Sequence, residues 1–287
     1  MENTQNLTEQ RLADAWATLH AHANQDAQLT PNADRIAFAD PEFLLRREVR
    51  GIRMQLEMLK PELGQAEHGI DNTIVVFGGA RFCSPEDAQA ALAKAQASGN
   101  AAQLTIAQRL VRNAPYYTQA REFGRLVGEH CLTCKRVNKM FICTGGGPGV
   151  MEAANRGAQD AGAVSVGLNI ALPHEQGANP YVTPELSFKF HYFALRKMHF
   201  MMRAKALVAF PGGFGTLDEL FEVLTLVQTH KAKPVPIFLY GSQYWKRLIN
   251  FDVLVDEGAI SPEDVKLFTY VDDPQTAWNE IKRFYAL

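Results

Sequence analysis

Three short apolar segments of this chain end in paired or tripled glycines, and each is followed by a helix-like stretch. They are Ile-Val-Val-Phe before Gly78, Phe-Ile-Cys-Thr before Gly145, and Val-Ala-Phe-Pro before Gly212. A short apolar run of this kind is typical of a parallel strand that is buried on both faces. Strands that alternate with helices predict an α/β chain with a doubly wound parallel sheet, covered by helices on both faces.

The rest of the chain fits the same alternation. We expect further strands at 164–173, 235–240 and 266–271, helices at 85–112 (broken at Ser-Gly-Asn), 116–132, 242–258 and from 273 onward, and a helix-like run over 188–206. Ligands of such sheets bind at the carboxyl ends of the strands, near the point where the strand order reverses. The glycine turns lie at these strand ends, so we expect the functional site there.

Residues 1–70 are polar at first and then helical, and we expect them to form an N-terminal helical extension to one domain over residues 71–287. Asp40 and Pro41 predict a helix start, as N-cap and first-turn residue. Apolar residues then recur at helical spacing and form one stripe, which we expect to pack on the main domain or on a second subunit: Leu44, Leu45, Val49, Ile52, Leu56 and Leu59.

Composition excludes several classes of function. The net charge of -2 gives no basic footprint for nucleic acid or for an anionic membrane. No apolar run approaches the roughly 20 residues that span a bilayer. The first ten residues lack the charged and apolar regions of a secretory signal, and the four cysteines resemble reduced thiols, so we expect a cytoplasmic protein. Cys131 and Cys134 have the spacing of a redox or zinc pair, but two half-buried cysteines near a helix end are the favoured interpretation.

Two of the glycine turns have the character of phosphate sites. In "TGGGPG" the glycines Gly145, Gly146 and Gly147 precede a helix whose positive end can hold an anion, although no Walker lysine follows. In "PGGFGT" the glycines are followed by Thr216, which offers a hydroxyl as well as an amide. Tight turns that require glycine explain each loop alone. Two such loops at neighbouring strand ends favour phosphate binding.

Two further features supply charge beside these loops. Thr216 and Glu219 fit a capping box, in which the glutamate reaches back to the helix start, yet Glu219 is also placed for acid–base chemistry one turn from the anion site. Arg196 and Lys197 lie just before the strand that leads into the second loop, where a cation would complement a phosphate. Basic residues on the solvated face of a core helix are the alternative interpretation.

Together these segments resemble the LOG (Lonely Guy) family, often labelled in error as lysine decarboxylases. The likeness rests on TGGGPG at 144–149, the Arg196-Lys197 pair and the pattern P-G-G-x-G-T-x-x-E at 211–219. It covers roughly residues 72–285 and looks like the longer bacterial branch.

The resemblance implies a Rossmann-like fold and a phosphoribohydrolase, which splits nucleoside 5'-monophosphates into free base and ribose 5-phosphate. It implies that Arg196 and Glu219 are catalytic. It also implies that the residues of the two glycine loops bind the substrate: Gly145, Gly146, Gly147, Gly212, Gly213, Gly215 and Thr216. We add Lys197 as a substrate-binding residue. Two weaker candidates are Glu152, for the ribose hydroxyls, and Arg81, for phosphate. We expect no metal, no cofactor and a homo-oligomer, a dimer or larger.

Two departures from the family pattern concern the pocket. Phe193, Ala194 and Leu195 stand where short members have Met-His-Glu, and the first turn reads Gly-Gly-Ala-Arg instead of Gly-Ser-Ser. An enzyme that acts on purine or pyrimidine monophosphates in general therefore fits the sequence as well as a cytokinin-specific enzyme does. The alternative from another class is a nucleotide-binding or carrier protein without turnover, which would need the glycines but not Glu219. A pyridoxal-phosphate decarboxylase is not favoured, because no lysine of this sequence lies in a context that suggests a Schiff base.

Overall fold

The computed structural model describes residues 36–172 and 177–287. The polar start of the extension, residues 1–35, and residues 173–176 lie outside the described residues. The chain divides into two compact units, with the boundary between Leu56 and Glu57.

The larger unit is built on a seven-stranded sheet in the order β4-β3-β2-β1-β5-β6-β7, and all of its neighbouring strands are parallel. The strands are β1 Thr73–Phe77, β2 Phe141–Thr144, β3 Val166–Ile170, β4 Ser187–Phe190, β5 Ala204–Ala209, β6 Ile237–Tyr240 and β7 Thr269–Val271. The chain steps outward from β1 to β4 and then returns to β5, directly beside β1. The strand order therefore reverses between β1 and β5. The predicted doubly wound, Rossmann-like α/β class is confirmed.

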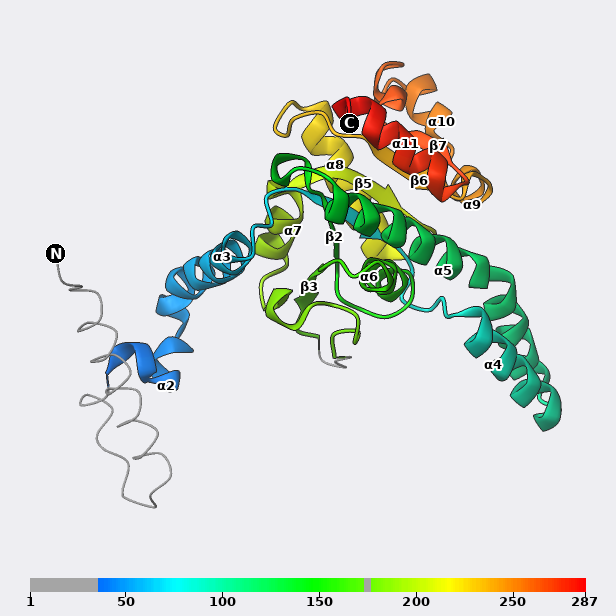
Figure 1. Ribbon diagram of the computed structural model, residues 1–287, viewed down its shortest axis with the longest axis horizontal. Helices are drawn as coiled ribbons and strands as arrows, with labels where there is room; N and C mark the ends of the chain where they lie inside the picture. Colours follow the sequence, from blue (N-terminus) through cyan, green and yellow to red (C-terminus); the bar gives the residue numbers. More distant parts are fainter. Residues whose placement is uncertain (1–35, 173–176) are drawn as a thin grey trace. The chain divides into compact units, whose positions relative to one another are not determined.

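Helices cover both faces of this sheet (Figure 1). The α-helices from residue 50 onward are α3 Arg50–Glu67, which crosses the unit boundary, α4 Pro85–Ser98, α5 Ala101–Thr133, α6 Val150–Asp160, α7 Phe193–Met202, α8 Phe214–Gln228, α9 Ser242–Leu248, α10 Phe251–Asp256 and α11 Pro274–Tyr285. Short 3₁₀ turns are η4 Arg136–Asn138, η5 Pro184–Leu186 and η6 Asp264–Lys266. Right-handed crossovers place α5 and α6 on one face, and α7 and α8 on the other.

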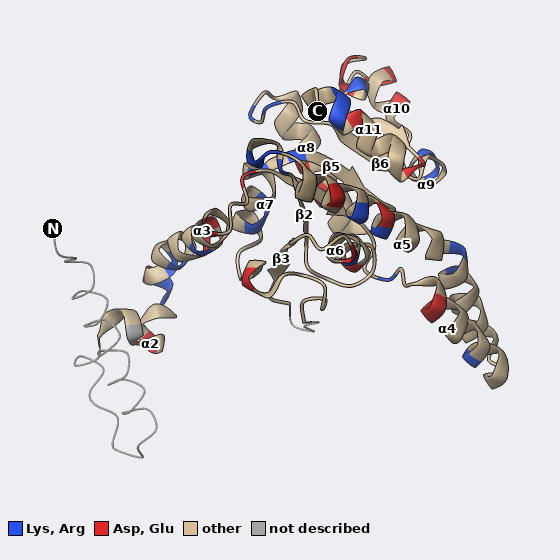
Figure 2. Ribbon diagram, in the orientation of Figure 1, with Lys and Arg blue, Asp and Glu red and all other residues tan. Residues whose placement is uncertain are grey.

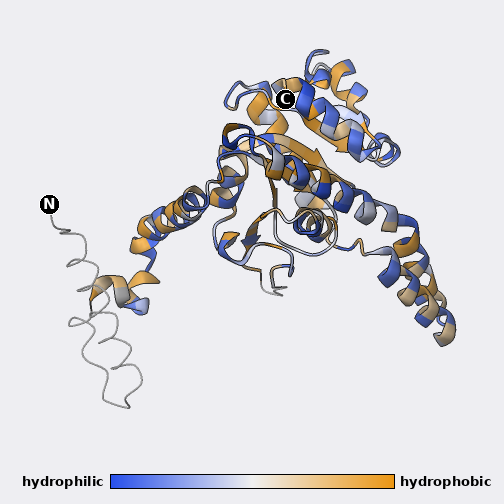
Figure 3. Cartoon of the chain, viewed as in Figure 1, coloured by the Kyte–Doolittle hydropathy of each residue, from blue (hydrophilic) through white to orange (hydrophobic). Residues whose placement is uncertain are grey.

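The hydrophobic core alternates along the strands as the pleat requires. Ile74 and Val76 of β1 belong to the cluster that also contains buried residues of α5, α6 and α11. Phe77 packs edge-on against Phe200 of α7, with ring centroids 4.9 Å apart. All five residues of β1 are buried, so this strand is the centre of the core. Figure 3 shows the sheet as predominantly hydrophobic between helices of alternating character.

Three predicted elements differ in the structure. The run 188–206 is not one helix, because Ser187–Phe190 forms edge strand β4, with Phe188 and Phe190 buried and Lys189 exposed. The alternation of buried and exposed residues in this strand is only four residues long and runs directly into a helical pattern, so the sequence did not reveal the strand. The predicted helices that end at 112 and begin at 116 are not separate, since α5 is one helix of 33 residues that contains Pro115. The stretch 242–258 forms two helices, α9 and α10, instead of one.

The smaller unit contains 3₁₀ helix η2 Ala37–Ala39, α2 Pro41–Leu44, 3₁₀ helix η3 Arg47–Val49 and the first turns of α3. The predicted start at Asp40 is confirmed, because its carboxylate accepts the backbone N–H groups of Glu42 and Phe43 at 3.0 and 3.2 Å. The predicted run is not one helix, however, since α2 ends at Leu44 and the chain becomes α-helical again only at Arg50. Within the predicted apolar stripe Val49 is buried, whereas the other members after Leu44 are at least half exposed: Leu45, Ile52, Leu56 and Leu59. The partner of this stripe stays a prediction.

Candidate active site

The two predicted phosphate loops are joined through Gly79, which follows β1. The N–H of Gly79 donates to the carbonyl of Pro211 at 2.9 Å, and the carbonyl of Gly79 accepts the N–H of Val150 at 3.2 Å. Pro211 opens the second loop, and Val150 is the first residue of α6 after the first loop. Both loops therefore lie at the carboxyl edge of the sheet, over the reversal of strand order between β1 and β5.

A buried polar network fixes the first loop. The hydroxyl of Thr144 accepts the N–H of Gly146 at 2.9 Å and donates to Asn155 Oδ1 at 2.7 Å. Asn179 donates from Nδ2 to the carbonyl of Gly147 at 3.0 Å, and its N–H donates to the carbonyl of Gly146 at 2.8 Å. Gly146 has a positive φ of 69°, which favours glycine. The loop is thus held in one conformation before any ligand binds.

Arg196 lies directly against this loop. A Cβ added to Gly145 would be 2.5 Å from Arg196 Nη2, so only glycine leaves room for the guanidinium. The Nε of Arg196 donates to the carbonyl of Leu168 in β3 at 2.7 Å. The guanidinium also lies over the ring of Phe200, 5.0 Å from its centroid. A glycine that sequence analysis assigned to ligand binding therefore also has a role inside the chain.

Arg196 and Glu219 form a buried ion pair. Arg196 Nη1 is 3.0 Å from Glu219 Oε1, and their side chains are 10% and 12% exposed. The pair brings together α7 and α8 at the edge where the first loop passes. The structure thus places in direct contact the two residues that the family resemblance implies are catalytic.

The electrostatics of this pair are unusual for a carboxylate. Burial raises the pKa of Glu219 from 4.5 to about 7, against the opposing effect of Arg196, and neighbouring Asp218 adds to the rise. Burial also lowers the pKa of Arg196, although the guanidinium stays charged. A carboxyl group that titrates near neutral pH in such a place is typical of acid–base sites.

The second loop contains glycines of two kinds. A Cβ on Gly212 would lie 2.1 Å from Thr216 Oγ1, so the packing of the buried Thr216 requires glycine there. Gly213 and Gly215 are exposed, have no positive φ, and no atom lies within 4 Å of an added Cβ. The described part of the chain gives no internal reason for these two glycines.

The predicted capping box does not form. Helix α8 begins at Phe214 with Gly213 as its N-cap, so Thr216 lies two residues inside the helix. No side chain of the described residues caps this helix start, and the carboxylate of Glu219 is bonded to Arg196 instead. The first-turn N–H groups of a 15-residue helix thus face the second loop without a side-chain acceptor.

Lys197 points to another part of α8. Its Nζ lies 2.8 Å from Asp218 Oδ1 and 3.2 Å from Glu222 Oε2. These acids are one helical turn apart and hold the ammonium between them. The structure therefore pairs Lys197 directly with Asp218 and Glu222 of α8, and its charge acts on Glu219 only through space, where it opposes the rise of the Glu219 pKa.

The two weaker candidates take part in other contacts. Glu152 accepts a hydrogen bond from the hydroxyl of Tyr117 in α5 at 2.8 Å, and Arg156 reaches the same hydroxyl at 3.5 Å. Arg81 is exposed after β1. Neither contacts Arg196 or Glu219 through a hydrogen bond or ion pair in residues 36–172 and 177–287.

Asn155 and Asn179 were missed in the sequence. They fix the first glycine loop but belong to no local motif, and Asn179 lies 32 residues after Gly147. Asn155 has only its position on the inner face of a helix that follows a glycine turn as a signal. Their role depends on tertiary contacts that a linear pattern does not contain.

Other classes of site find little support in the described residues. No group of three or more His, Cys, Asp and Glu side chains there could hold a metal ion. Cys131 is buried and Cys134 half-buried at the end of α5, and both are free thiols. No helix of the described part is long and apolar enough to cross a bilayer. Figure 2 shows basic and acidic residues interspersed over the helices.

Comparison with known proteins gives consistent matches. The family model described as "Possible lysine decarboxylase" matches residues 151–281. The cytokinin riboside 5'-monophosphate phosphoribohydrolase LOG7 of Arabidopsis thaliana is 45% identical over 69 residues, 23% of this chain and 31% of that protein. The probable enzyme LOGL5 of Oryza sativa subsp. japonica is 33% identical over 154 residues, 53% of this chain and 58% of that protein. LOG of the same rice is 30% identical over 156 residues, 53% of this chain and 60% of that protein.

These matches span less than two thirds of each relative's own length. Among solved structures, the X-ray structure of TM1055 matches with 19% identity and a TM-score of 0.48, over 74% of this chain and 99% of that one. The Moco carrier protein from Chlamydomonas reinhardtii matches with 20% identity and a TM-score of 0.46, over 75% of this chain and 98% of that one.

Proposed function

We propose that the chain is a phosphoribohydrolase of the LOG family, which its matches to the family model and to the rice enzymes support. It hydrolyses the N-glycosidic bond of nucleoside 5'-monophosphates and releases the free base and ribose 5-phosphate. The observation that carries this proposal is the buried Arg196–Glu219 pair beside two glycine loops, with a carboxyl group that titrates at about pH 7.

The 5'-phosphate binds at the second loop in this proposal. Gly213 and Gly215 let phosphate oxygens approach the backbone, and the uncapped first-turn N–H groups of α8 donate to them. The first loop, with Gly145, Gly146 and Gly147, closes the other side. Because Thr216 is buried against Gly212, its amide is better placed for phosphate than its hydroxyl.

Glu219 acts on the sugar. Cleavage of the glycosidic bond passes through a state with positive charge on the ribose, as in other glycosidases. The ionised carboxylate stabilises that charge and orients or deprotonates the attacking water, which typically contributes about 10²–10⁴-fold to the rate. Arg196 fixes the carboxylate through the 3.0 Å ion pair and does not transfer a proton itself.

The pH dependence follows from the same group. Because the carboxylate form is the active one, kcat/KM rises with pH through about 7 as Glu219 ionises. The substrate phosphate also titrates, with a pKa of about 6. A Glu219→Gln variant keeps the lower inflection in its residual activity and loses the upper one.

Two kinds of base are candidates for the substrate. AMP-like nucleotides and cytokinin riboside 5'-monophosphates are both candidates, the latter because the relatives' names state that substrate. Phe193 is half exposed at the start of α7 and Leu195 is buried, so neither replaces the polar side chains of short members.

A nucleotide panel tests the function. Purified protein is incubated with AMP, GMP, CMP, UMP and a cytokinin riboside monophosphate, and free base is separated by chromatography. The matching nucleosides serve as controls, because they lack the phosphate that the second loop binds. Release of base from at least one monophosphate and from none of the nucleosides supports the proposal. Binding without base release is the result expected of a carrier and contradicts it.

We also propose a cytoplasmic homo-oligomer, a dimer or larger. Large apolar side chains on the outer surface of α7 and α8 support a subunit contact: Phe193, Met198, Met202, Phe214 and Phe221 are 38–91% exposed. Light scattering after gel filtration measures the mass, and a monomer of 31.9 kDa contradicts the proposal.

A further inference from the structure

A cavity of about 810 Å³ lies beside the second glycine loop and not at the Arg196–Glu219 pair. It is formed by α5, by α9 and by the ends of β5 and β6. Its lining shares Pro211, which opens the second loop, with the candidate active site, but includes none of the predicted catalytic or substrate-binding residues. Its volume is within the range of small-molecule sites, roughly 300–1,000 Å³.

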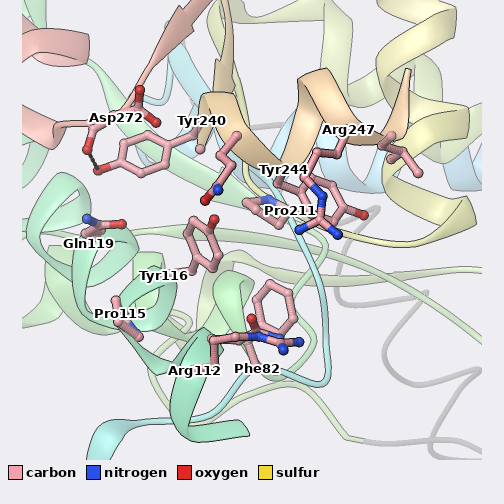
Figure 4. A pocket seen from close by; sticks show the side chains of 14 residues that line it. Phe82, Arg112, Pro115, Tyr116, Gln119, Pro211, Tyr240, Tyr244, Arg247 and Asp272 are labelled. Atoms are coloured by element: carbon pink, nitrogen blue, oxygen red, sulfur yellow. Dashed lines mark hydrogen bonds between the residues drawn. The ribbon is translucent and has the colours of Figure 1, made fainter. Parts of the chain in front are cut away.

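Two arginines from different helices line this cavity. Arg112 comes from α5 and Arg247 from α9, as Figure 4 shows. Within the described residues neither guanidinium has an ion pair with a carboxylate. Asp272 is the acid among the lining residues, and its two oxygens are occupied by the backbone N–H and hydroxyl of Ser242 at 2.7 and 2.6 Å. Two cations that share one cavity with a single carboxylate, and with no ion pair to it, give the cavity a net positive charge that favours an anionic ligand.

Aromatic rings form the wall between the two arginines. Phe82 and Tyr116 stack with 5.9 Å between ring centroids and 23° between ring planes, and Tyr244 lies on the α9 side (Figure 4). Carboxamide side chains, among them Gln119, also line the cavity. A planar heteroaromatic ring finds stacking surfaces and hydrogen-bond partners here.

We propose that this cavity is a nucleotide-binding site separate from the Arg196–Glu219 site. Phosphate groups lie between Arg112 and Arg247, and the base packs against Phe82 and Tyr116. The combination of paired guanidinium groups, an aromatic wall and carboxamides in one cavity carries the inference, and it does not rest on the proposed hydrolase activity.

The site is in contact with the second loop through one hydrogen bond. The hydroxyl of Tyr244 donates to the carbonyl of Gly212 at 2.5 Å. The same tyrosine lines the cavity, so a nucleotide bound there contacts a residue that holds the loop.

Calorimetric titration of the full chain with ADP tests the proposal. The variant Arg112→Gln/Arg247→Gln removes both charges and is expected to bind ADP at least about 100-fold more weakly, since each charge-assisted contact is worth about tenfold or more. The control Arg109→Gln/Lys246→Gln makes the same change of charge on the same two helices at residues outside the cavity. We expect it to bind ADP within about threefold of wild type, because neither Arg109 nor Lys246 lines the cavity.

A third variant separates the cavity from the second loop. Gly215→Ala obstructs a phosphate at the backbone of the second loop and is expected to keep wild-type ADP affinity, since Gly215 does not line the cavity. No ADP binding by wild type, unchanged binding by the cavity variant, or loss of binding in Gly215→Ala would overturn the proposal. Binding of inorganic pyrophosphate as tight as that of ADP would also overturn it, because the ring would then contribute nothing. AMP hydrolysis is assayed separately, so a failed hydrolase proposal does not change these outcomes.

Discussion

Replacing Gly212 with alanine should damage both stability and activity. The new Cβ would lie 2.1 Å from Thr216 Oγ1 and 2.7 Å from Thr216 Cβ, distances that atoms in folded proteins do not adopt. Thr216 is only 5% exposed and is fixed within α8, so it cannot move without shifting the start of that helix. Overpacking of this kind costs about 1–3 kcal/mol.

Gly215→Ala is the matched control three residues further along. No atom lies within 4 Å of its added Cβ, and the residue lies in the first turn of α8. Alanine is a better helix former than glycine by up to about 1 kcal/mol, so this variant should be as stable as wild type or more stable. Its methyl group would nevertheless obstruct a phosphate at the backbone, and we expect KM for AMP to rise at least about tenfold.

Urea unfolding followed by circular dichroism measures the stability of both variants, and initial rates of base release measure their activity. The expected pattern is a loss of both properties in Gly212→Ala and a loss of activity alone in Gly215→Ala. Wild-type stability in Gly212→Ala would refute the packing argument. A wild-type KM in Gly215→Ala would refute the proposal that phosphate binds at the backbone of the second loop.

Other predictions concern pH, the first loop and Lys197. The raised pKa of Glu219 stabilises the fold below pH 4.5, and this contribution is lost as pH rises through about 7, by roughly 3 kcal/mol; urea unfolding of wild type should show this loss, and that of Glu219→Gln should not. Asn155→Ala removes a buried hydrogen-bond partner of Thr144. It should lower the free energy of unfolding by about 1–3 kcal/mol and raise KM for AMP. Unchanged values in both assays would contradict the role of this hydrogen-bond network in holding the first loop. Lys197→Met leaves the acids of α8 without their cation, so we expect a stability loss of about 1 kcal/mol and KM within about threefold; a large KM increase at wild-type stability would instead favour the sequence-based prediction that Lys197 binds substrate.

The sequence predicted the architecture well because short apolar strands and glycine turns are local signals. Six of the strands were expected, and β4 was missed since its alternation is short and runs directly into a helical pattern. The continuation of α5 through Pro115 was also missed, because proline is a break signal in an exposed helix and only the packing of α5 on the sheet overrides it.

The candidate site was predicted only in part. The family pattern named Arg196 and Glu219, but only the structure shows that their side chains contact each other and that no capping box competes for the carboxylate. Asn155 and Asn179 could not be found from the sequence, since the network that joins them to the first loop spans 35 residues of chain. The cavity between Arg112 and Arg247 was also missed, because residues of α5 and α9 meet there only in three dimensions.

The most direct test of the proposed function is base release by Glu219→Gln, compared with Asp218→Asn. Glutamine keeps the size of the side chain and an acceptor for Arg196, whereas the control changes the neighbouring acid of the same helix, which pairs with Lys197. We predict that Glu219→Gln is folded and releases base about 10²–10⁴-fold more slowly than wild type, and that Asp218→Asn stays within about threefold. Full activity of Glu219→Gln would contradict the proposal that this carboxylate performs the chemistry.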